Sequence, residues 1–136
     1  MKRTATAVWN GSGKEGSGNL TTQSSTLNKT QYSYKSRFEE GVGTNPEELI
    51  AAAHAGCFAM KLSFVLQAAG LTADSLDVTS TVTLDNGVIT SSALVLKAKI
   101  PNIDAGKFKE YAEDAKTNCP VSKLLKADIS LDASLV

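Results

Sequence analysis

A long and almost uninterrupted apolar segment lies in the middle of the chain. From Leu49 to Met60 nearly every residue is apolar or small, and no polar face interrupts the pattern. A helix of this kind is expected to be surrounded by protein on all sides. Asn45 and Pro46 indicate its start, because asparagine caps free amides and proline suits the first helical position. Gly70 indicates a left-handed C-terminal stop.

Two neighbouring carboxylates at the start of this helix have different expected roles. With Asn45 as the cap, Glu48 occupies the third helical position, from which it can reach back to the cap amide in a capping box. Glu47 is then the carboxylate without a structural task. It is therefore the one available for chemistry.

Alternating apolar and polar positions predict strands on both sides of the helix. Asp85-Asn86-Gly87 is typical of a tight hairpin turn. Asp104 is expected to cap a second helix, which Asn118-Cys119-Pro120 ends, and Pro120 to begin a short third one. The predicted strands cover residues 3–9, 19–27, 31–38, 77–84, 88–100 and 128–136. Hairpins instead of repeated strand-helix crossovers predict an α+β fold. Because no linker or repeat is visible, we expect a single domain over residues 1–136.

Charge and composition argue against a nucleic-acid-binding protein and against a membrane-spanning one. The chain has 136 residues, with 14 basic and 14 acidic side chains and a formal net charge of zero. No basic run provides the electrostatic footprint of a nucleic-acid binder. His54 and Lys61 interrupt the apolar segment, which argues against a membrane span. No N-terminal leader with a cleavage site is recognisable, so the expected location is cytoplasmic.

One glycine-rich stretch matches a dinucleotide-binding motif in the spacing of its glycines but not in its structural context. Gly11, Gly13 and Gly16 have the spacing of a dinucleotide fingerprint. No helical pattern follows them, and the strand-helix-strand context is missing. A hairpin loop is the interpretation that we adopt.

Cys57 is the main candidate for reactivity, because it lies in the apolar part of the long helix. Burial raises the pKa of a thiol, so a reactive Cys57 needs a nearby cation that favours the thiolate. Arg37 is the best candidate for that cation, and Glu47 could orient the guanidinium. Spacing alone leaves an alternative open, in which Cys57 is a small core residue, Arg37 a surface charge and Glu47 a partner of the helix dipole.

Cys119 adds a second thiol at the predicted start of a short helix. Free amides there could stabilise a thiolate, and Cys119 could attack an oxidised Cys57 to form a disulfide. The alternative is a half-buried thiol that caps a turn. The two cysteines are 62 positions apart, so sequence does not place them within bonding distance.

Helix geometry leads to an expectation about assembly. Glu47 and Cys57 are ten positions apart on one helix, which corresponds to about 15 Å along its axis. A straight helix therefore keeps them in separate places, and another segment or a second subunit must bridge them. Pairing of the long helices across a two-fold axis predicts an intertwined homodimer with composite sites.

His54 allows two other kinds of site. It precedes Cys57 by three positions, so a Cys-His nucleophilic pair could form on adjoining helical faces. Such a hydrolase also needs an orienting group and an oxyanion hole, neither of which is identifiable. A satisfied core or interface histidine is the more frequent case. One histidine and two distant cysteines do not have the compact spacing of a metal site.

Four segments of the chain resemble the OsmC/Ohr family of osmotically inducible and organic-hydroperoxide-resistance proteins, nearer to its OsmC branch. They include Ser36-Arg37-Phe38, the stretch from Gly43 to Leu49, the stretch from Ala52 to Phe58, and the stretch from Asn118 to Ala127. The resemblance implies an intertwined α+β homodimer and thiol-dependent reduction of hydroperoxides, without metal or flavin cofactor.

The same resemblance assigns a role to each candidate residue. It makes Cys57 the peroxidatic cysteine, Cys119 the resolving cysteine, Arg37 the thiolate-activating arginine and Glu47 its partner. The expected reductant is an external thiol or a lipoyl-type dithiol, in a protein of oxidative or osmotic stress defence. The rival hypothesis from another class is a non-enzymatic stress protein that binds a small apolar ligand between its long helices.

Overall fold

The computed structural model describes all 136 residues and confirms the predicted α+β class. The chain forms two compact units, residues 1–49 and residues 50–136, which are described separately below.

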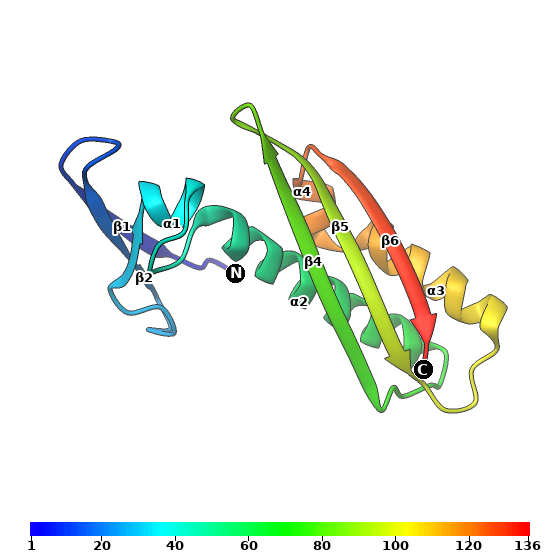
Figure 1. The fold of residues 1–136 in the computed structure, drawn as a ribbon. Helices are drawn as coiled ribbons and strands as arrows, with labels where there is room; N and C mark the ends of the chain where they lie inside the picture. The colour runs from blue at the N-terminus through cyan, green and yellow to red at the C-terminus, as the bar shows by residue number, and fades with distance from the viewer. The chain divides into compact units, whose positions relative to one another are not determined.

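The first unit contains a three-stranded antiparallel sheet in the order β1-β2-β3 (Figure 1). Its strands are β1 (Ala5–Asn10), β2 (Ser17–Thr22) and β3 (Thr30–Ser33). The glycine-rich stretch joins β1 to β2 as the expected hairpin loop. The predicted strand 19–27 ends early, because the amide of Thr22 donates to the carbonyl of Leu27 at 3.0 Å and closes a turn there. Every residue of β1 is exposed.

The segment that carries Arg37 is a short helix, α1 (Tyr34–Phe38), so the predicted strand 31–38 is wrong in its second half. Ser33 and Ser36 explain the change. The Ser33 hydroxyl accepts from the Ser36 amide at 3.2 Å, and the Ser36 hydroxyl accepts from the Ser33 amide at 2.9 Å. This reciprocal capping box satisfies two amides at the start of α1 and stops the strand.

The long predicted helix is present as α2 (Pro46–Ala68). Asn45 caps it as expected, since its side-chain oxygen accepts from the Glu48 amide at 2.8 Å. Glu48 does not complete the predicted capping box, because its carboxylate accepts from the Thr44 hydroxyl instead. After the helix, Gly70 has a φ of 74° and makes the expected left-handed stop.

The second unit contains a mixed three-stranded sheet in the order β4-β5-β6. Strands β4 (Ser75–Asp85) and β5 (Val88–Lys99) are antiparallel, and β6 (Asp128–Leu135) runs parallel to β5 at the sheet edge. Asn86 and Gly87 have φ values of 47° and 78°, which confirms the predicted tight turn between β4 and β5.

Two further helices follow β5 at the predicted places. Helix α3 (Ala105–Asn118) begins at Asp104, whose carboxylate accepts from the Lys107 amide at 3.0 Å. Helix α4 (Pro120–Leu124) begins at Pro120, with Cys119 as its N-cap residue. The Asn118-Cys119-Pro120 break therefore separates two helices and places Cys119 between them.

The hydrophobic core of the second unit lies between its sheet and its helices (Figure 1). Three elements supply most of the buried side chains: Phe58, Leu62 and Leu66 from α2, Leu94, Leu96 and Ala98 from β5, and Phe108, Ala112 and Ala115 from α3. Alternate residues of β5 therefore face the helices, as the period of a strand requires.

Only one face of α2 is buried in the single chain, so the expectation of burial on all sides is wrong for this chain alone. Met60 and Phe64 are 63% and 61% exposed, whereas Phe58 and Leu62 are fully buried. The reason is that one sheet and one neighbouring helix cover only one side. By length and composition α2 could also cross a membrane, a test that core helices of soluble proteins pass as well.

Replacement of Leu62 by alanine should measure how strongly α2 is anchored to the core. Leu62→Ala removes a fully buried side chain and should lower the free energy of unfolding by about 2–5 kcal/mol in urea titrations. Leu124→Ala is the matched control, because Leu124 is 79% exposed and its loss should change stability by less than about 0.5 kcal/mol. Equal effects of the two substitutions would contradict the described core.

Candidate functional site

Arg37 and Glu47 form the ion pair that we expected from the sequence. The Arg37 Nε donates to both Glu47 carboxylate oxygens at 3.1 and 3.2 Å, and Nη2 donates to Oε1 at 2.7 Å. Hydrogen bonding to the Glu47 carboxylate raises the pKa of Arg37, which keeps the guanidinium charged. Arg37 remains 38% exposed at its side chain, against 13% for Glu47. Two-point contact fixes the guanidinium plane while leaving part of it accessible.

Aromatic side chains form a hollow beside this ion pair. The hollow has a volume of about 250 Å³. Its lining includes Arg37 with Trp9, Tyr32, Tyr34 and Phe38. The guanidinium carbon of Arg37 lies 5.0 Å from the centre of the Phe38 ring. Trp9 was not among the candidate residues, because nothing in its local sequence links it to Arg37.

The second unit brings the two cysteines together, which their separation in sequence could not establish. Cys57 on α2 is half-buried, Cys119 at the start of α4 is fully buried, and both thiols are free. Burial raises the pKa of Cys57, and a hydrogen bond with the Cys119 thiol raises it further. Proximity of this kind is the requirement for a disulfide between them.

One backbone amide opposes the effect of burial on Cys57. A hydrogen bond to the backbone of Val121, in the first turn of α4, lowers the pKa of the Cys57 thiol. From the sequence we expected amides at this helix start to stabilise a thiolate at Cys119, whereas the Val121 amide bonds to Cys57. None of the groups that shift the pKa of Cys57 is a cation, and burial outweighs the amide. A thiolate at Cys57 therefore needs a positive charge in addition to the groups that shift it here.

His54 does not pair with Cys57 but belongs to a buried network of hydroxyl groups. It is fully buried, with Nδ1 2.6 Å from the Ser92 hydroxyl and Nε2 2.8 Å from the Ser122 hydroxyl. Burial lowers the pKa of His54, so the ring is neutral near pH 7. Both ring nitrogens are occupied by serines, which removes the geometry of a Cys-His hydrolase.

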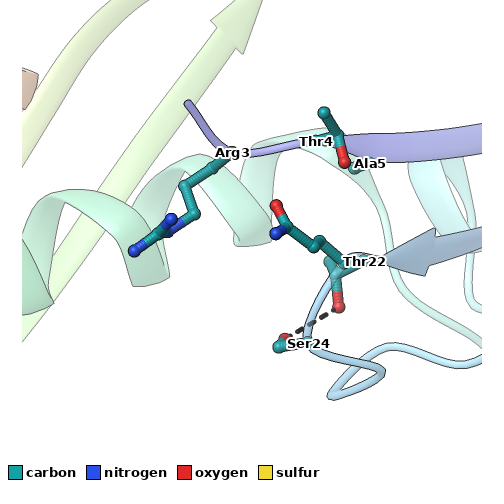
Figure 2. A pocket seen from close by; sticks show the side chains of 6 residues that line it. Arg3, Thr4, Ala5, Thr22 and Ser24 are labelled. Atoms are coloured by element: carbon teal, nitrogen blue, oxygen red, sulfur yellow. Dashed lines mark hydrogen bonds between the residues drawn. The ribbon is translucent and has the colours of Figure 1, made fainter. Parts of the chain in front are cut away.

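A second and larger hollow lies at the end of the first sheet and contains none of the candidate residues. Its volume is about 770 Å³. Figure 2 shows its lining, with the Thr22 and Ser24 hydroxyls hydrogen-bonded at 3.2 Å. The lining residues are Arg3, Thr4, Ala5, Thr22, Gln23 and Ser24. Such an open surface with a single charged side chain offers no catalytic group. No cluster of three or more potential metal ligands is present in the chain.

Comparison with known proteins decides the family. The sequence pattern described as OsmC-like protein matches residues 39–134, which include Glu47 and both cysteines. The chain belongs to the OsmC family. The peroxiredoxin OsmC of Escherichia coli K12 is 47% identical over 133 residues, which cover 95% of this chain and 93% of that protein.

More distant relatives extend the family assignment to the organic hydroperoxide resistance proteins. The protein OhrB of Bacillus subtilis is 31% identical over 102 residues, covering 71% of this chain and 73% of OhrB. An OsmC-like protein from Mycoplasma pneumoniae has a similar crystal structure, with a TM-score of 0.75 over 100% of this chain and 98% of that one. At 18% identity this last likeness concerns the fold.

The buried His54 should make the stability of this OsmC-family protein depend on pH. Its pKa is lowered in the folded state, so below the unfolded-state pKa of about 6.5 the unfolded chain gains a proton that the folded chain does not. The free energy of unfolding should therefore fall with decreasing pH, by at most about 1.4 kcal/mol per unit from this group.

The measurement is urea unfolding between pH 7.5 and pH 5 for the wild type and for His54→Gln. The substitution removes the titrating group, so the variant should show a flatter pH profile below pH 6.5. Parallel profiles would mean that His54 takes up its proton in the folded protein as easily as in the unfolded one.

Proposed function

We propose that this protein is a thiol-dependent peroxidase that reduces organic hydroperoxides with Cys57 as the attacking thiol. The observation that carries the proposal is the juxtaposition of Cys57 and Cys119 in a member of the OsmC family. Relatives named as a peroxiredoxin and as organic hydroperoxide resistance proteins support the substrate class. Hydrogen peroxide is a second candidate substrate with the same chemistry.

The first step oxidises Cys57. Its thiolate attacks the distal oxygen of the hydroperoxide, the O–O bond breaks, and the alkoxide leaves as an alcohol after it takes up a proton. Cys57 becomes a sulfenic acid and the peroxide is reduced by two electrons. Only the thiolate is nucleophilic, so the rate depends on how far the surroundings offset the pKa rise that burial causes at Cys57.

The second step forms a disulfide within the chain. The Cys119 thiol attacks the sulfenic sulfur, a sulfur-sulfur bond forms, and the hydroxyl group leaves as water. An external dithiol, either a small thiol or a lipoyl-type group, then reduces the bridge by thiol-disulfide exchange. The chemistry in this form needs no metal or flavin.

Arg37 and Glu47 have the properties that Cys57 requires. The guanidinium is charged, oriented by three hydrogen bonds and still partly exposed. In the proposed mechanism Arg37 stabilises the Cys57 thiolate and the charge that develops on the leaving oxygen, while Glu47 fixes Arg37. The aromatic hollow beside Arg37 offers an apolar surface to the organic part of the substrate.

We infer further that the working unit is a homodimer in which one chain supplies Arg37 and Glu47 to Cys57 of its partner. Two uncovered surfaces support this inference: the exposed side of α2 around Met60 and Phe64, and the wholly exposed strand β1. A dimer would cover apolar area that water now contacts. Oxidative or osmotic stress defence in the cytoplasm is the role that fits such an enzyme.

A comparison of four proteins tests the roles of the two cysteines. Cumene hydroperoxide consumption with dithiothreitol should be measured for the wild type, Cys57→Ser, Cys119→Ser and His54→Ala. Cys57→Ser should lose activity by at least about 100-fold, because no other thiol can form the sulfenic acid. Cys119→Ser should accumulate a sulfenic acid at Cys57 that dimedone traps.

His54→Ala serves as the control for the hydrolase hypothesis and should retain peroxide reduction above that of Cys57→Ser. Absence of turnover by the wild type above buffer would refute the peroxidase proposal and favour the non-enzymatic ligand-binding alternative. Unchanged activity of Cys57→Ser would show that the reactive group is elsewhere.

A further inference from the structure

His54 connects three elements of the second unit. The residue itself belongs to α2, its Nδ1 partner Ser92 to β5, and its Nε2 partner Ser122 to α4. Ser80 on β4 extends the network, with its hydroxyl 3.0 Å from that of Ser92. A neutral imidazole donates at one nitrogen and accepts at the other, so the two serines satisfy the ring completely.

The two ends of the His54-Ser122 bond lie close in sequence to the two thiols. His54 is three residues before Cys57 on α2, which is about one helical turn. Ser122 is three residues after Cys119 and directly follows Val121, whose backbone hydrogen-bonds to Cys57. The bond therefore joins the turn of α2 that carries Cys57 to the turn of α4 that follows Cys119.

Helix α4 is short, and its other anchors are the packing of Val121 and Cys119 against the core and the Val121 backbone bond to Cys57. The helix has five residues, its N-cap residue makes no side-chain capping bond, and Leu124 at its end is 79% exposed. A helix of this length has little stability of its own. A buried imidazole-hydroxyl bond is directional, unlike apolar packing, and it is costly to break because each partner would be left unsatisfied in the core.

We propose that His54 is a positioning residue for the second step of the reaction, acting through Ser122 to hold Cys119 within reach of Cys57. The inference rests on the proposed roles of the two cysteines. Neither His54 nor Ser122 touches the reacting sulfur atoms in this assignment. They set the effective concentration of one thiol beside the other, on which both the rate and the equilibrium of disulfide formation depend.

Ser122→Ala is the substitution that isolates this bond. It removes one hydroxyl, keeps the helix propensity of α4 and leaves His54 bonded to Ser92. Two quantities should be measured: the equilibrium of the Cys57-Cys119 disulfide in a dithiothreitol redox buffer, and the lifetime of the Cys57 sulfenic acid after one equivalent of cumene hydroperoxide. The first should shift about tenfold toward the dithiol, and the second should lengthen about tenfold.

Two further variants distinguish positioning from a general effect on stability. Ser122→Thr keeps the hydroxyl and should restore both quantities to within about twofold of the wild type. Ser63→Ala is the matched control, since it removes a serine hydroxyl from another helix, α2, where the hydroxyl is exposed and bonds only to the Met60 carbonyl. It should leave both quantities unchanged.

Wild-type values of both quantities in Ser122→Ala would overturn the proposal, as would a loss that Ser122→Thr fails to restore. The redox equilibrium requires no peroxide, so it separates this proposal from the proposed function. A wild-type protein that forms no Cys57-Cys119 disulfide in the redox buffer would refute the roles of the cysteines, and the positioning role with them. A disulfide that forms equally well without the Ser122 hydroxyl would refute the positioning role alone.

Discussion

Removing a thiol from water is the constraint on which the chemistry of this protein depends. Cys57 gains a place on a rigid helix beside Cys119, but burial there stabilises the neutral thiol over the nucleophilic thiolate. The Val121 backbone offsets only part of that effect. In the proposed mechanism an oriented guanidinium supplies what is missing, because it remains charged near neutral pH. The ion pair of Arg37 with Glu47 is the group that we propose for this role, because its guanidinium is oriented and partly exposed.

The need of Cys57 for a cation and the exposed apolar surfaces of the chain both point to a second subunit. Helix α2 packs one face against the second sheet and exposes an apolar face, and the first sheet has no hydrophobic core of its own. A small sheet needs an apolar partner to be stable. In the proposed dimer these surfaces would cover one another, and the composite site would form as a result of the assembly that stabilises the fold.

Local signals carried most of the predictable structure. Asn45, Asp104 and Pro120 each fix an element through a bond or a backbone preference that acts within one turn, and these predictions were confirmed. The Arg37-Glu47 pair was also predictable, because the sequence assigned a capping role to Glu48 and none to Glu47, although Glu48 bonds to Thr44 in place of the cap amide. The strand predicted through Arg37 was wrong, because the prediction followed the alternation of aromatic and polar residues. The Ser33-Ser36 capping box is an equally local signal, and in the structure it starts a helix.

Contacts between distant segments could not be predicted. The proximity of Cys119 to Cys57 and the bonds from His54 to Ser92 and Ser122 join positions 38 to 68 residues apart. Spacing carries no information about such contacts, because they depend on how the sheet and the helices pack. The family resemblance supplied the cysteine pair. It did not supply the serine network, for which the sequence has only isolated serines in otherwise alternating strands.

Whether one chain's Arg37 activates the partner chain's Cys57 can be decided with a purified heterodimer. Arg37→Ala and Cys57→Ser chains with different affinity tags should be co-expressed and isolated by both tags. This heterodimer should have about half of the wild-type peroxidase activity, since one of its two composite sites is intact. A heterodimer of Cys57→Ser and Cys119→Ser chains should stay unable to form the disulfide, because that bond lies within one chain. An Arg37→Ala/Cys57→Ser heterodimer as inactive as its parents would show that Arg37 does not activate the partner chain's Cys57.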